Sequence, residues 1–400
     1  MITAEQIIKY VEEHREEAIR CLRDIVKVPS VTGEEEAVSK VFTAWIESTG
    51  LTVTDYPSAP GRPNLVSEWS GSQPGKRFVF NGHMDVFPPS EGDVMPYGPW
   101  DAVIDGGFMY GRGTADMKAG DAAALMAVKF LRELHFDPKG TIVLTYVSDE
   151  ENGGWMGVKH LIELGLGNGD FGICMEPSSG DIIAQHWGIL RLKFVFTAEH
   201  HHAGTPHPKL DALEQAIMAA NRFYALDKEL NKIKDENGDC PCLSVTMLHS
   251  GNTINVQPGY AELCIDRRFS PDENIDDVMK QILDIMEDLK ASEPNFDYTY
   301  ELKNDRPALN IPFDDPFVQL AADSYEQIMG KRPLISRRPG GSDAANLRQA
   351  YGISMPNWSG SGETCRVGIY GSGGSHERID LQDYVDTIKY YMMTVVNAMS

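Results

Sequence analysis

The sequence predicts an α/β protein with a smaller domain inserted into its chain. Three apolar runs, each followed directly by polar residues, are typical of buried strands in an α/β sheet. They lie at 78–80, 141–148 and 171–175. From residue 188 apolar and polar residues alternate, which is typical of antiparallel strands with one solvated face. After residue 303 the earlier pattern returns. We therefore predict one domain of residues 1–187 with 304–400 and an inserted domain of residues 188–303.

The composition argues against several classes of protein. The chain has 400 residues, and 42% of them are apolar, as in ordinary globular proteins. Its formal charge of −23 argues against nucleic acid or an anionic membrane as a partner. No apolar run approaches the roughly 20 residues of a membrane span. The first residues lead into a charged amphipathic helix and not an apolar signal core, so we expect a cytoplasmic protein. Six cysteines in a chain of this length do not indicate a disulfide scaffold.

Two amphipathic helices are expected at the start of the first domain. Apolar residues recur at helical spacing over 3–27, which Pro29 ends, and over 34–48, where Gly50 is a C-cap signal. The run Gly111-Arg112-Gly113 resembles part of a phosphate-binding loop. It lacks the preceding strand and the Gly-Lys-Ser/Thr ending, so we assign no such loop. The other expected elements are strands at 51–55 and 64–69, a long loop at 90–109 and a helix at about 118–134.

The inserted domain is predicted to have the order βαββαβ. Its first strand is the alternating run 190–197. Ser270-Pro271-Asp272-Glu273 is a capping box with proline at the first helical position, which predicts a helix from there to about 290. Its other elements are a helix at about 208–229 and strands near 243–249, 260–269 and 296–302. Helices then follow near 315–329, from 340–344 onward and at about 381–398.

Residues of metal-binding type stand at the predicted strand ends and loop–helix junctions. They are His83, Asp116, Glu151, Glu176 and His376. Zinc binds His nitrogen and carboxylate oxygen. Two metal ions about 3.5–4 Å apart need a bridging ligand, ligands on each side and a base for the water. Glu150 remains as that base, because adjacent side chains point in different directions.

Each of these residues also has a plainer explanation when it is taken alone. Asp116 is about as well explained as a helix cap. Glu150 and Glu151 are typical of a solvated turn, Glu176 before a proline can simply end a strand, and His376 in a glycine-rich loop can be exposed. Their joint placement in one chain favours the metal site.

Five motifs, in this order, resemble the zinc metallopeptidase family of acetylornithine deacetylase, succinyl-diaminopimelate desuccinylase, aminoacylase and carboxypeptidase G. The motifs are Asn-Gly-His83-Met-Asp85, Gly-Arg-Gly-Thr-Ala-Asp116-Met-Lys, Asp-Glu150-Glu151, Glu176-Pro and Gly-Gly-Ser-His376-Glu. The resemblance covers nearly the whole chain. It implies a mixed-sheet zinc-hydrolase catalytic domain and an inserted ferredoxin-like domain that serves as a lid or in dimerisation.

The resemblance also implies a role for each motif in the metal site. Asp116 would bridge two zinc ions, although cobalt and manganese also suit His and carboxylate ligands. His83 and Glu176 would complete one metal site, and Glu151 and His376 the other.

The remaining roles concern proton transfer and orientation. Asp85 would orient His83. Glu150 would be the general base, taking a proton from the metal-bound water and passing it to the leaving nitrogen. The peptide between Asp116 and Met117 is a candidate for the cis bond of the family.

Two segments of the inserted domain resemble substrate-contacting parts of the family. His202, in His-Ala-Gly-Thr-Pro, resembles a histidine that reaches, often from the partner subunit, to the tetrahedral oxyanion. Asn255 and Arg268 resemble contacts to a substrate carboxylate, which suits the planar fork of arginine. An equally good explanation of Arg268 is a strand-face arginine paired with a surface acid. Neighbouring histidines at 200, 201 and 207 are better explained as exposed than as a second metal site.

These observations predict a dizinc hydrolase that cleaves the amide bond of an N-acyl amino acid or of a small peptide with a free carboxylate. By the same resemblance the protein is expected to be a homodimer. Two alternatives stay open. One is a non-catalytic metal- or substrate-binding relative, against which the intact Glu150 argues. The other is a dizinc aminopeptidase, against which the inserted domain argues by analogy of fold.

Overall fold

The computed structural model divides into two compact units, which are described separately here. It describes residues 2–90, 95–205, 209–234, 238–360 and 373–400. The first unit comprises Met1–Gln185, Ile311–Arg338 and Ser342–Ser400. The second comprises His186–Asn310 with Pro339–Gly341.

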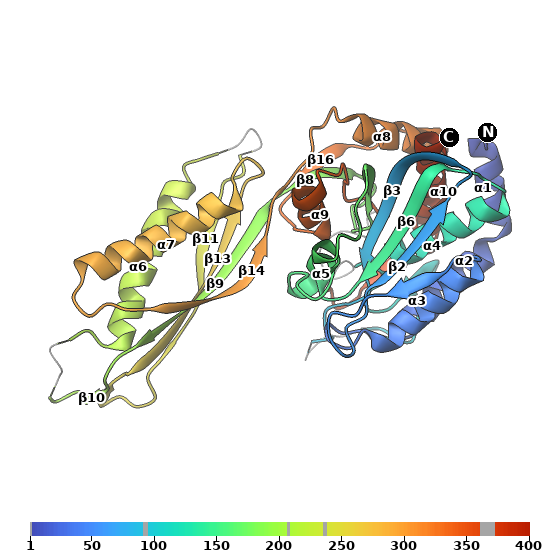
Figure 1. Cartoon of the computed structure of the whole chain (residues 1–400). Coiled ribbons are helices and arrows are strands. Elements are labelled where there is room, and N and C mark those ends of the chain that lie inside the picture. Colours follow the sequence, from blue (N-terminus) through green and yellow to red (C-terminus); the bar gives the residue numbers. More distant parts are fainter. Residues whose placement is uncertain (1, 91–94, 206–208, 235–237, 361–372) are drawn as a thin grey trace. The chain divides into compact units, whose positions relative to one another are not determined.

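A five-stranded mixed sheet forms the centre of the first unit, in the order β1-β2-β6-β3-β7 (Figure 1). Its strands are β1 (Val53–Asp55), β2 (Leu65–Ser70), β3 (Gln73–His83), β6 (Lys139–Val147) and β7 (Phe171–Cys174). β3 lies parallel to both β6 and β7, whereas β2 lies antiparallel to β6 and to β1. His83 is in register with Val147, so the carboxyl ends of β3 and β6 stand side by side.

Helices cover this sheet, and two of them, α4 and α10, pack on each other and on β3. Aromatic rings fill the interface between β3 and the helices. The ring centroids of Phe80 of β3 and Tyr391 of α10 are 5.3 Å apart. The ring of Phe171 of β7 stacks on that of Phe317 of α8, with 4.9 Å between their centroids. The helices are α1 (Ala4–Glu13), α2 (Arg15–Val26), α3 (Glu36–Ser48), α4 (Lys118–Glu133), α5 (Val158–Glu163), α8 (Pro316–Met329), α9 (Asp343–Tyr351) and α10 (Leu381–Met399).

A small antiparallel sheet joins distant parts of the chain in the order β17-β5-β4. Its strands are β4 (Val103–Asp105), β5 (Phe108–Tyr110) and β17 (Arg378–Asp380). The prediction of one long loop over 90–109 is therefore wrong in its second half, because β5 pairs with a strand that lies far along the sequence. Shorter strands elsewhere are β8 (Ile182–His186), β15 (Leu309–Asn310) and β16 (Ile335–Arg338).

The second unit has one antiparallel sheet in the order β11-β13-β9-β14. Its elements, in the predicted order βαββαβ, are β9 (Gly188–Thr197), α6 (Ala212–Leu230), β11 (Cys242–Ser250), β13 (Tyr260–Phe269), α7 (Ile275–Ser292) and β14 (Thr299–Arg306). α6 and α7 cover one face, and apolar side chains such as Phe194, Leu263 and Ile282 form the core beneath them. A two-stranded ribbon, β10 (His201–His202) with β12 (Val256–Gln257), extends the unit. The predicted fold class, a mixed-sheet α/β unit with a smaller inserted sheet unit, is confirmed.

Two predicted helices differ from the structure. The helix expected over 3–27 is two helices, because His14 leaves the helical conformation (φ −110°, ψ 17°) while its ring Nδ1 lies 2.8 Å from the Tyr10 carbonyl. The residues Ser270-Pro271-Asp272-Glu273 form a turn in which Glu273 accepts from the Ser270 amide at 2.7 Å. The helix itself starts at Ile275, where Asn274 caps it.

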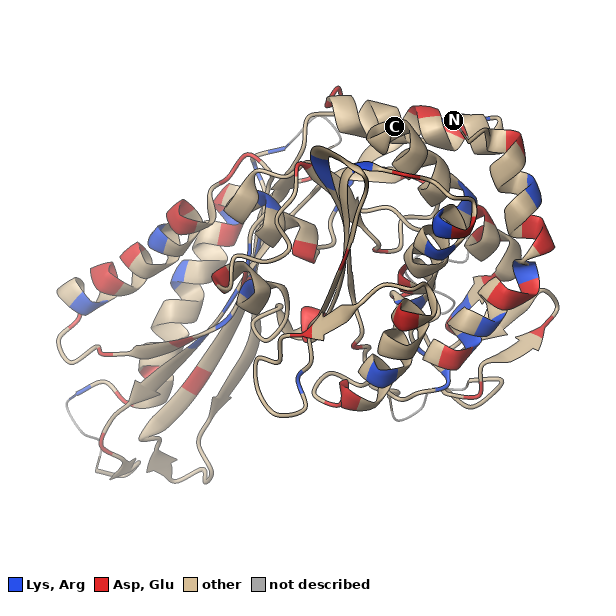
Figure 2. Ribbon diagram, turned by 45° about the vertical axis from the view of Figure 1, so that its right-hand side comes forward, with Lys and Arg blue, Asp and Glu red and all other residues tan. Residues whose placement is uncertain are grey.

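Charge is spread over both units. Figure 2 shows Asp and Glu interspersed with Lys and Arg along the outer helices. Within the described residues, no helix combines the length and the apolar character that crossing a membrane requires.

Candidate metal centre

Four of the predicted site residues come from the ends of parallel strands. His83 is the last residue of β3, Glu150 and Glu151 open the short 3₁₀ helix η1 (Glu150–Asn152) just after β6, and Glu176 follows β7. Since the carboxyl ends of parallel strands meet at one edge of a sheet, the topology brings these side chains together. Asp116 joins them from the loop before α4.

The distances around His83 define a compact cluster. Its Nε2 lies 3.2 Å from Asp116 Oδ1, 3.7 Å from Glu176 Oε1 and 4.0 Å from Glu150 Oε2. Two sets of three residues each place one potential ligand atom within 4.8 Å of the others. They are His83 with Glu150 and Glu176, and His83 with Asp116 and Glu151.

The electrostatics of this cluster favour a bound cation. Burial opposes protonation of His83, but the hydrogen bond to Asp116 and the charges of Glu150 and Asp85 raise its pKa well above the ordinary value. Burial, and then the charge of Asp116, raise the pKa of Glu151 well above the ordinary value. The carboxylates around His83 thus stabilise its positively charged form. A bound cation would in the same way relieve the repulsion between the carboxylates.

The donor set also fits a metal by its chemistry. His nitrogen and carboxylate oxygen are zinc ligands. Among the described residues, Glu151 Oε1 is buried and has no hydrogen-bond partner, which a coordinated cation would supply. His376 belongs to neither set of three, and its Nδ1 lies 3.2 Å from Ser375 Oγ, so its role as a ligand stays a prediction.

Asp85 organises the site in a way that the sequence did not indicate. His83 Nδ1 lies 2.8 Å from the main-chain carbonyl oxygen of Asp85 and 3.6 Å from its carboxylate. The carboxylate instead accepts hydrogen bonds from the amides of Glu150 (3.0 Å) and Glu151 (3.3 Å) and from Thr32 Oγ1 (2.8 Å). It thereby fixes the turn that carries both glutamates.

A buried ion pair holds the Asp116 loop. Glu377 Oε1 accepts from the amides of Ala115 (2.9 Å) and Asp116 (3.2 Å), and Glu377 Oε2 accepts from Arg112 Nη1 (2.9 Å). Burial raises the pKa of Glu377 to about 7, and Arg112 opposes this rise. The segment just after His376 is thus fastened beneath Asp116. The peptide between Asp116 and Met117 is cis, as expected.

Sequence reasoning missed these supporting residues. Arg112 lies in the glycine-rich run that was considered as a phosphate loop, and it binds Glu377 inside the protein. A signal was present, since Glu377 directly follows His376 in its motif, but nothing local shows what it binds. Asp121 was also missed. Both of its carboxylate oxygens are buried with no partner among the described residues, and burial raises its pKa well above the ordinary value.

The residues predicted to contact substrate lie in the second unit. His202 of β10 is exposed and in register with Val256, which places it beside Asn255. Arg268 of β13 forms an ion pair with Asp266 at 2.6 Å. That contact agrees with the plainer explanation of a strand-face arginine paired with an acid, and the substrate role of Arg268 stays a prediction.

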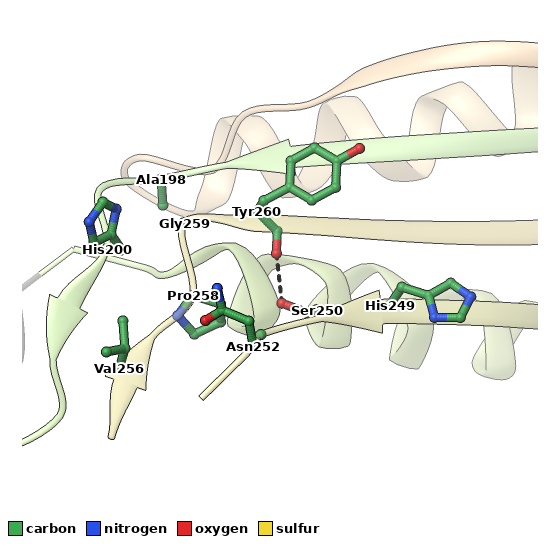
Figure 3. Close-up of a pocket in the computed structure, with 10 residues that line it drawn as sticks. Ala198, His200, His249, Ser250, Asn252, Val256, Pro258, Gly259 and Tyr260 are labelled. Carbon is green, nitrogen blue, oxygen red and sulfur yellow. Dashed lines mark hydrogen bonds between the residues drawn. The ribbon is translucent and has the colours of Figure 1, made fainter. Parts of the chain in front are cut away.

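The extra histidines do not form a metal cluster among the described residues. His200 and His249 line a hollow of about 580 Å³ in the second unit, and Figure 3 shows them at opposite ends of it. Neither they nor His201 belongs to a set of potential ligands. Residue 207 lies outside the described residues.

Comparison with known proteins identifies the family. Residues 79–397 match the family model described as Peptidase family M20/M25/M40. The chain belongs to this family. Succinyl-diaminopimelate desuccinylase of Methylorubrum extorquens is 28% identical over 341 residues, which span 82% of this chain and 86% of that protein. The resemblance drawn from the five motifs is therefore confirmed, and the protein is an M20 family metallohydrolase.

Solved structures share its fold. The metallo-carboxypeptidase Sso-CP2 of Sulfolobus solfataricus superposes with a TM-score of 0.76 at 17% identity, covering 95% of this chain and 98% of that one. Aminopeptidase PepT of Bacillus cereus gives a TM-score of 0.74 at 20% identity, covering 96% and 98%. An aminopeptidase thus has both units as well. The expectation that the inserted domain argues against an aminopeptidase is therefore wrong.

Proposed function

We propose that this M20 enzyme is a dizinc hydrolase that cleaves the amide bond of an N-acyl amino acid or of a small peptide with a free carboxylate. The observation that carries the proposal is the cluster at the carboxyl ends of β3, β6 and β7, where Glu150 stands within 4.0 Å of His83. The desuccinylase name of the relatives favours the acyl amino acid.

His83, Asp116, Glu151, Glu176 and His376 would hold the two metal ions. Bound there, the ions would polarise the scissile carbonyl and lower the pKa of the attacking water. Cobalt or manganese would suit the same ligands.

The chain's own groups would move the proton. Glu150 accepts the proton of the attacking water and then donates it to the leaving nitrogen. Asp85 keeps Glu150 in place by accepting from its amide. Burial of Glu150 excludes bulk water from this transfer.

The geometry of the second unit bears on the partner subunit. Tyr260 and Arg268 are eight residues apart on β13, so their Cα atoms are separated by roughly 26 Å at ~3.3 Å per residue. Tyr260 pairs with Thr197 at the end of β9, and β10, which carries His202 beside Asn255, follows from that end of the sheet. Figure 1 shows β10 beyond one end of the sheet. A small substrate that touches Arg268 is therefore out of reach of His202 of the same chain. This supports a homodimer in which His202 and Asn255 serve the partner's site.

The surface of the second unit offers an interface for such a dimer. β11 is an edge strand of the sheet, and α6 packs beside it. Met247 of β11 and Ile217 and Tyr224 of α6 are exposed apolar residues. Unpaired backbone groups on an edge strand next to apolar side chains favour pairing with another chain.

A substrate panel tests the proposal. Chelator-stripped protein would be offered N-acetyl, N-succinyl and dipeptide substrates with and without added zinc. We expect release of one amine that depends on zinc, and loss of that turnover in Glu150→Gln with two metal ions still bound. An enzyme that is equally active after stripping would refute the metal mechanism. Substantial activity of Glu150→Gln would refute only the role of Glu150 as the base and would leave the metal mechanism standing.

A further inference from the structure

The turn that carries Glu150 starts at a residue in an unusual conformation. Asp149 lies between β6 and η1 with φ 72° and ψ 13°, in the left-handed region that residues other than glycine seldom adopt. Its main-chain carbonyl accepts from the amides of Asn152 (3.2 Å) and Gly154 (2.8 Å). Such a conformation persists only where surrounding contacts hold it. The direction in which Glu150 leaves the strand depends on Asp149.

The side chain of Asp149 is held from two sides. Its Oδ2 accepts from the amide of Met156 at 3.0 Å, which closes the loop after η1. Its Oδ1 accepts from Arg62 Nη2 at 2.8 Å. Among the described residues, Arg62 is the one cation that pairs with Asp149.

Arg62 is itself oriented by a second carboxylate. Its Nε lies 3.1 Å from Oε2 of Glu35, a residue with no exposed surface. The Gly33 amide donates to the other oxygen of Glu35 at 2.9 Å. The guanidinium thus lies between two acids. Its Nη2 donates a hydrogen bond to Asp149, whereas Nε and Glu35 Oε2 form an ion contact without hydrogen-bond geometry. A planar fork can face two acids in this way, which the point charge of an ammonium group does less well.

The guanidinium can be reached from solvent. Arg62 lines a surface hollow of about 670 Å³ together with Gly61, Pro63 and Lys40. Its side chain keeps 17% of its surface exposed. A small cation from solution could therefore take the place of a deleted guanidinium.

We propose that Arg62 is a positioning residue for the reaction and acts on Glu150 through Asp149. Asp85 fixes the Glu150 amide, and the pair of Arg62 and Asp149 fixes the backbone that precedes it. The two contacts together set where the Glu150 carboxylate points. The inference rests on the proposed role of Glu150 as general base. Neither Arg62 nor Asp149 belongs to the sets of potential metal ligands, so their loss should leave metal binding intact.

The test compares Arg62→Met with Arg77→Met. Arg77 is a matched control on the same unit, because it also pairs with an acid, Glu68, at 2.6 Å. Partners that orient a site typically contribute 10–100-fold to activity. We expect Arg62→Met to lower kcat by about 10–100-fold with little change in KM and with unchanged metal content, and Arg77→Met to keep the wild-type kcat.

Chemical rescue separates positioning from a general structural role. Guanidinium chloride, far below denaturing concentrations, should raise kcat of Arg62→Met and leave the wild type and Arg77→Met unchanged. Asp149→Asn should lower kcat to a similar extent, and the double variant should be no worse than either single variant, because both remove one interaction. Asp149→Asn also keeps the inference testable if Arg62→Met does not fold.

Two results would overturn the inference. One is a kcat of Arg62→Met within twofold of the wild type. The other is a loss of kcat that goes with loss of bound metal and that guanidinium does not restore. Failure of the base assignment is recognised separately, because Glu150→Gln would then stay active whatever the Arg62 variants show.

Discussion

The buried pair of Arg112 and Glu377 gives the sharpest prediction about how the site is assembled. Glu377→Gln keeps the size of the side chain but removes its charge. The amide oxygen can still accept from the Ala115 and Asp116 amides, and the amide NH₂ then faces the guanidinium of Arg112, which also only donates. The buried cation loses its carboxylate partner, although Nη1 still donates to the carbonyl oxygen of Gly374 at 3.1 Å.

The expected cost follows from the burial of both groups, since Arg112 is 1% exposed and Glu377 is fully buried. Removing one partner of a buried pair costs about 3–5 kcal/mol, because the other charge is left uncompensated. Arg112→Met removes the cation instead, and Glu377, whose pKa is already raised to about 7, can then hold a proton. The double variant removes both charges of the pair and should cost less than Glu377→Gln alone.

Urea unfolding of the four proteins, with and without zinc, measures this coupling. We also expect Glu377→Gln to weaken metal binding by about 10–100-fold in a competition titration, because Asp116 is less firmly held. The reasoning would be refuted if Glu377→Gln lost less than about 1 kcal/mol. It would also be refuted if the free energies of unfolding of the two single variants simply added.

Two further predictions concern the second unit. Burial, and then Arg306, lower the pKa of His186 to about 4 from 6.5. The unfolded protein therefore takes up a proton on His186 near pH 6.5, whereas the folded protein does so only near pH 4. As the pH falls from 6.5 to 4, this difference lowers the free energy of unfolding by about 3 kcal/mol in all. The free energy of unfolding of His186→Asn, measured in urea, should lack this part of the pH dependence. The same pH dependence as in the wild type would contradict the assignment. The other prediction concerns activity: in a dimer that shares His202, mixing inactive His202→Ala and Glu150→Gln chains should restore activity, because one site then has both groups intact. Silence of the mixed dimers, with hybrid formation verified, would place His202 in its own chain's site.

The sequence predicted which residues lie close together where potential ligands directly follow strands, and their role as metal ligands stays a prediction. The residues that follow the apolar runs 78–80, 141–148 and 171–175 indicated the cluster. Placement at a strand end is a local property, and parallel strands bring their carboxyl ends to one edge of the sheet. The motif around His376 was recognised in the same way. The structure, however, leaves His376 outside both sets of potential ligands among the described residues.

Support from remote residues could not be predicted in this way. Arg112 and Glu377 are 265 positions apart, and Arg62 and Asp149 are 87 apart. No periodicity or spacing links them. The break at His14 and the late start of the helix at Ile275 were missed for a related reason, since apolar spacing marks the face of a helix and not its ends.

The sequence by itself determined the α/β class, the inserted βαββαβ unit, the family and the type of residue at each strand end. Local patterns and motif order determine these properties. Only the tertiary structure decided that the Asp85 carboxylate holds the Glu150 turn, that Glu377 fastens the Asp116 loop, and that His202 and Arg268 lie far apart in one unit. Strand pairing and register decide such contacts, because they bring together residues whose separation along the chain carries no trace of their proximity.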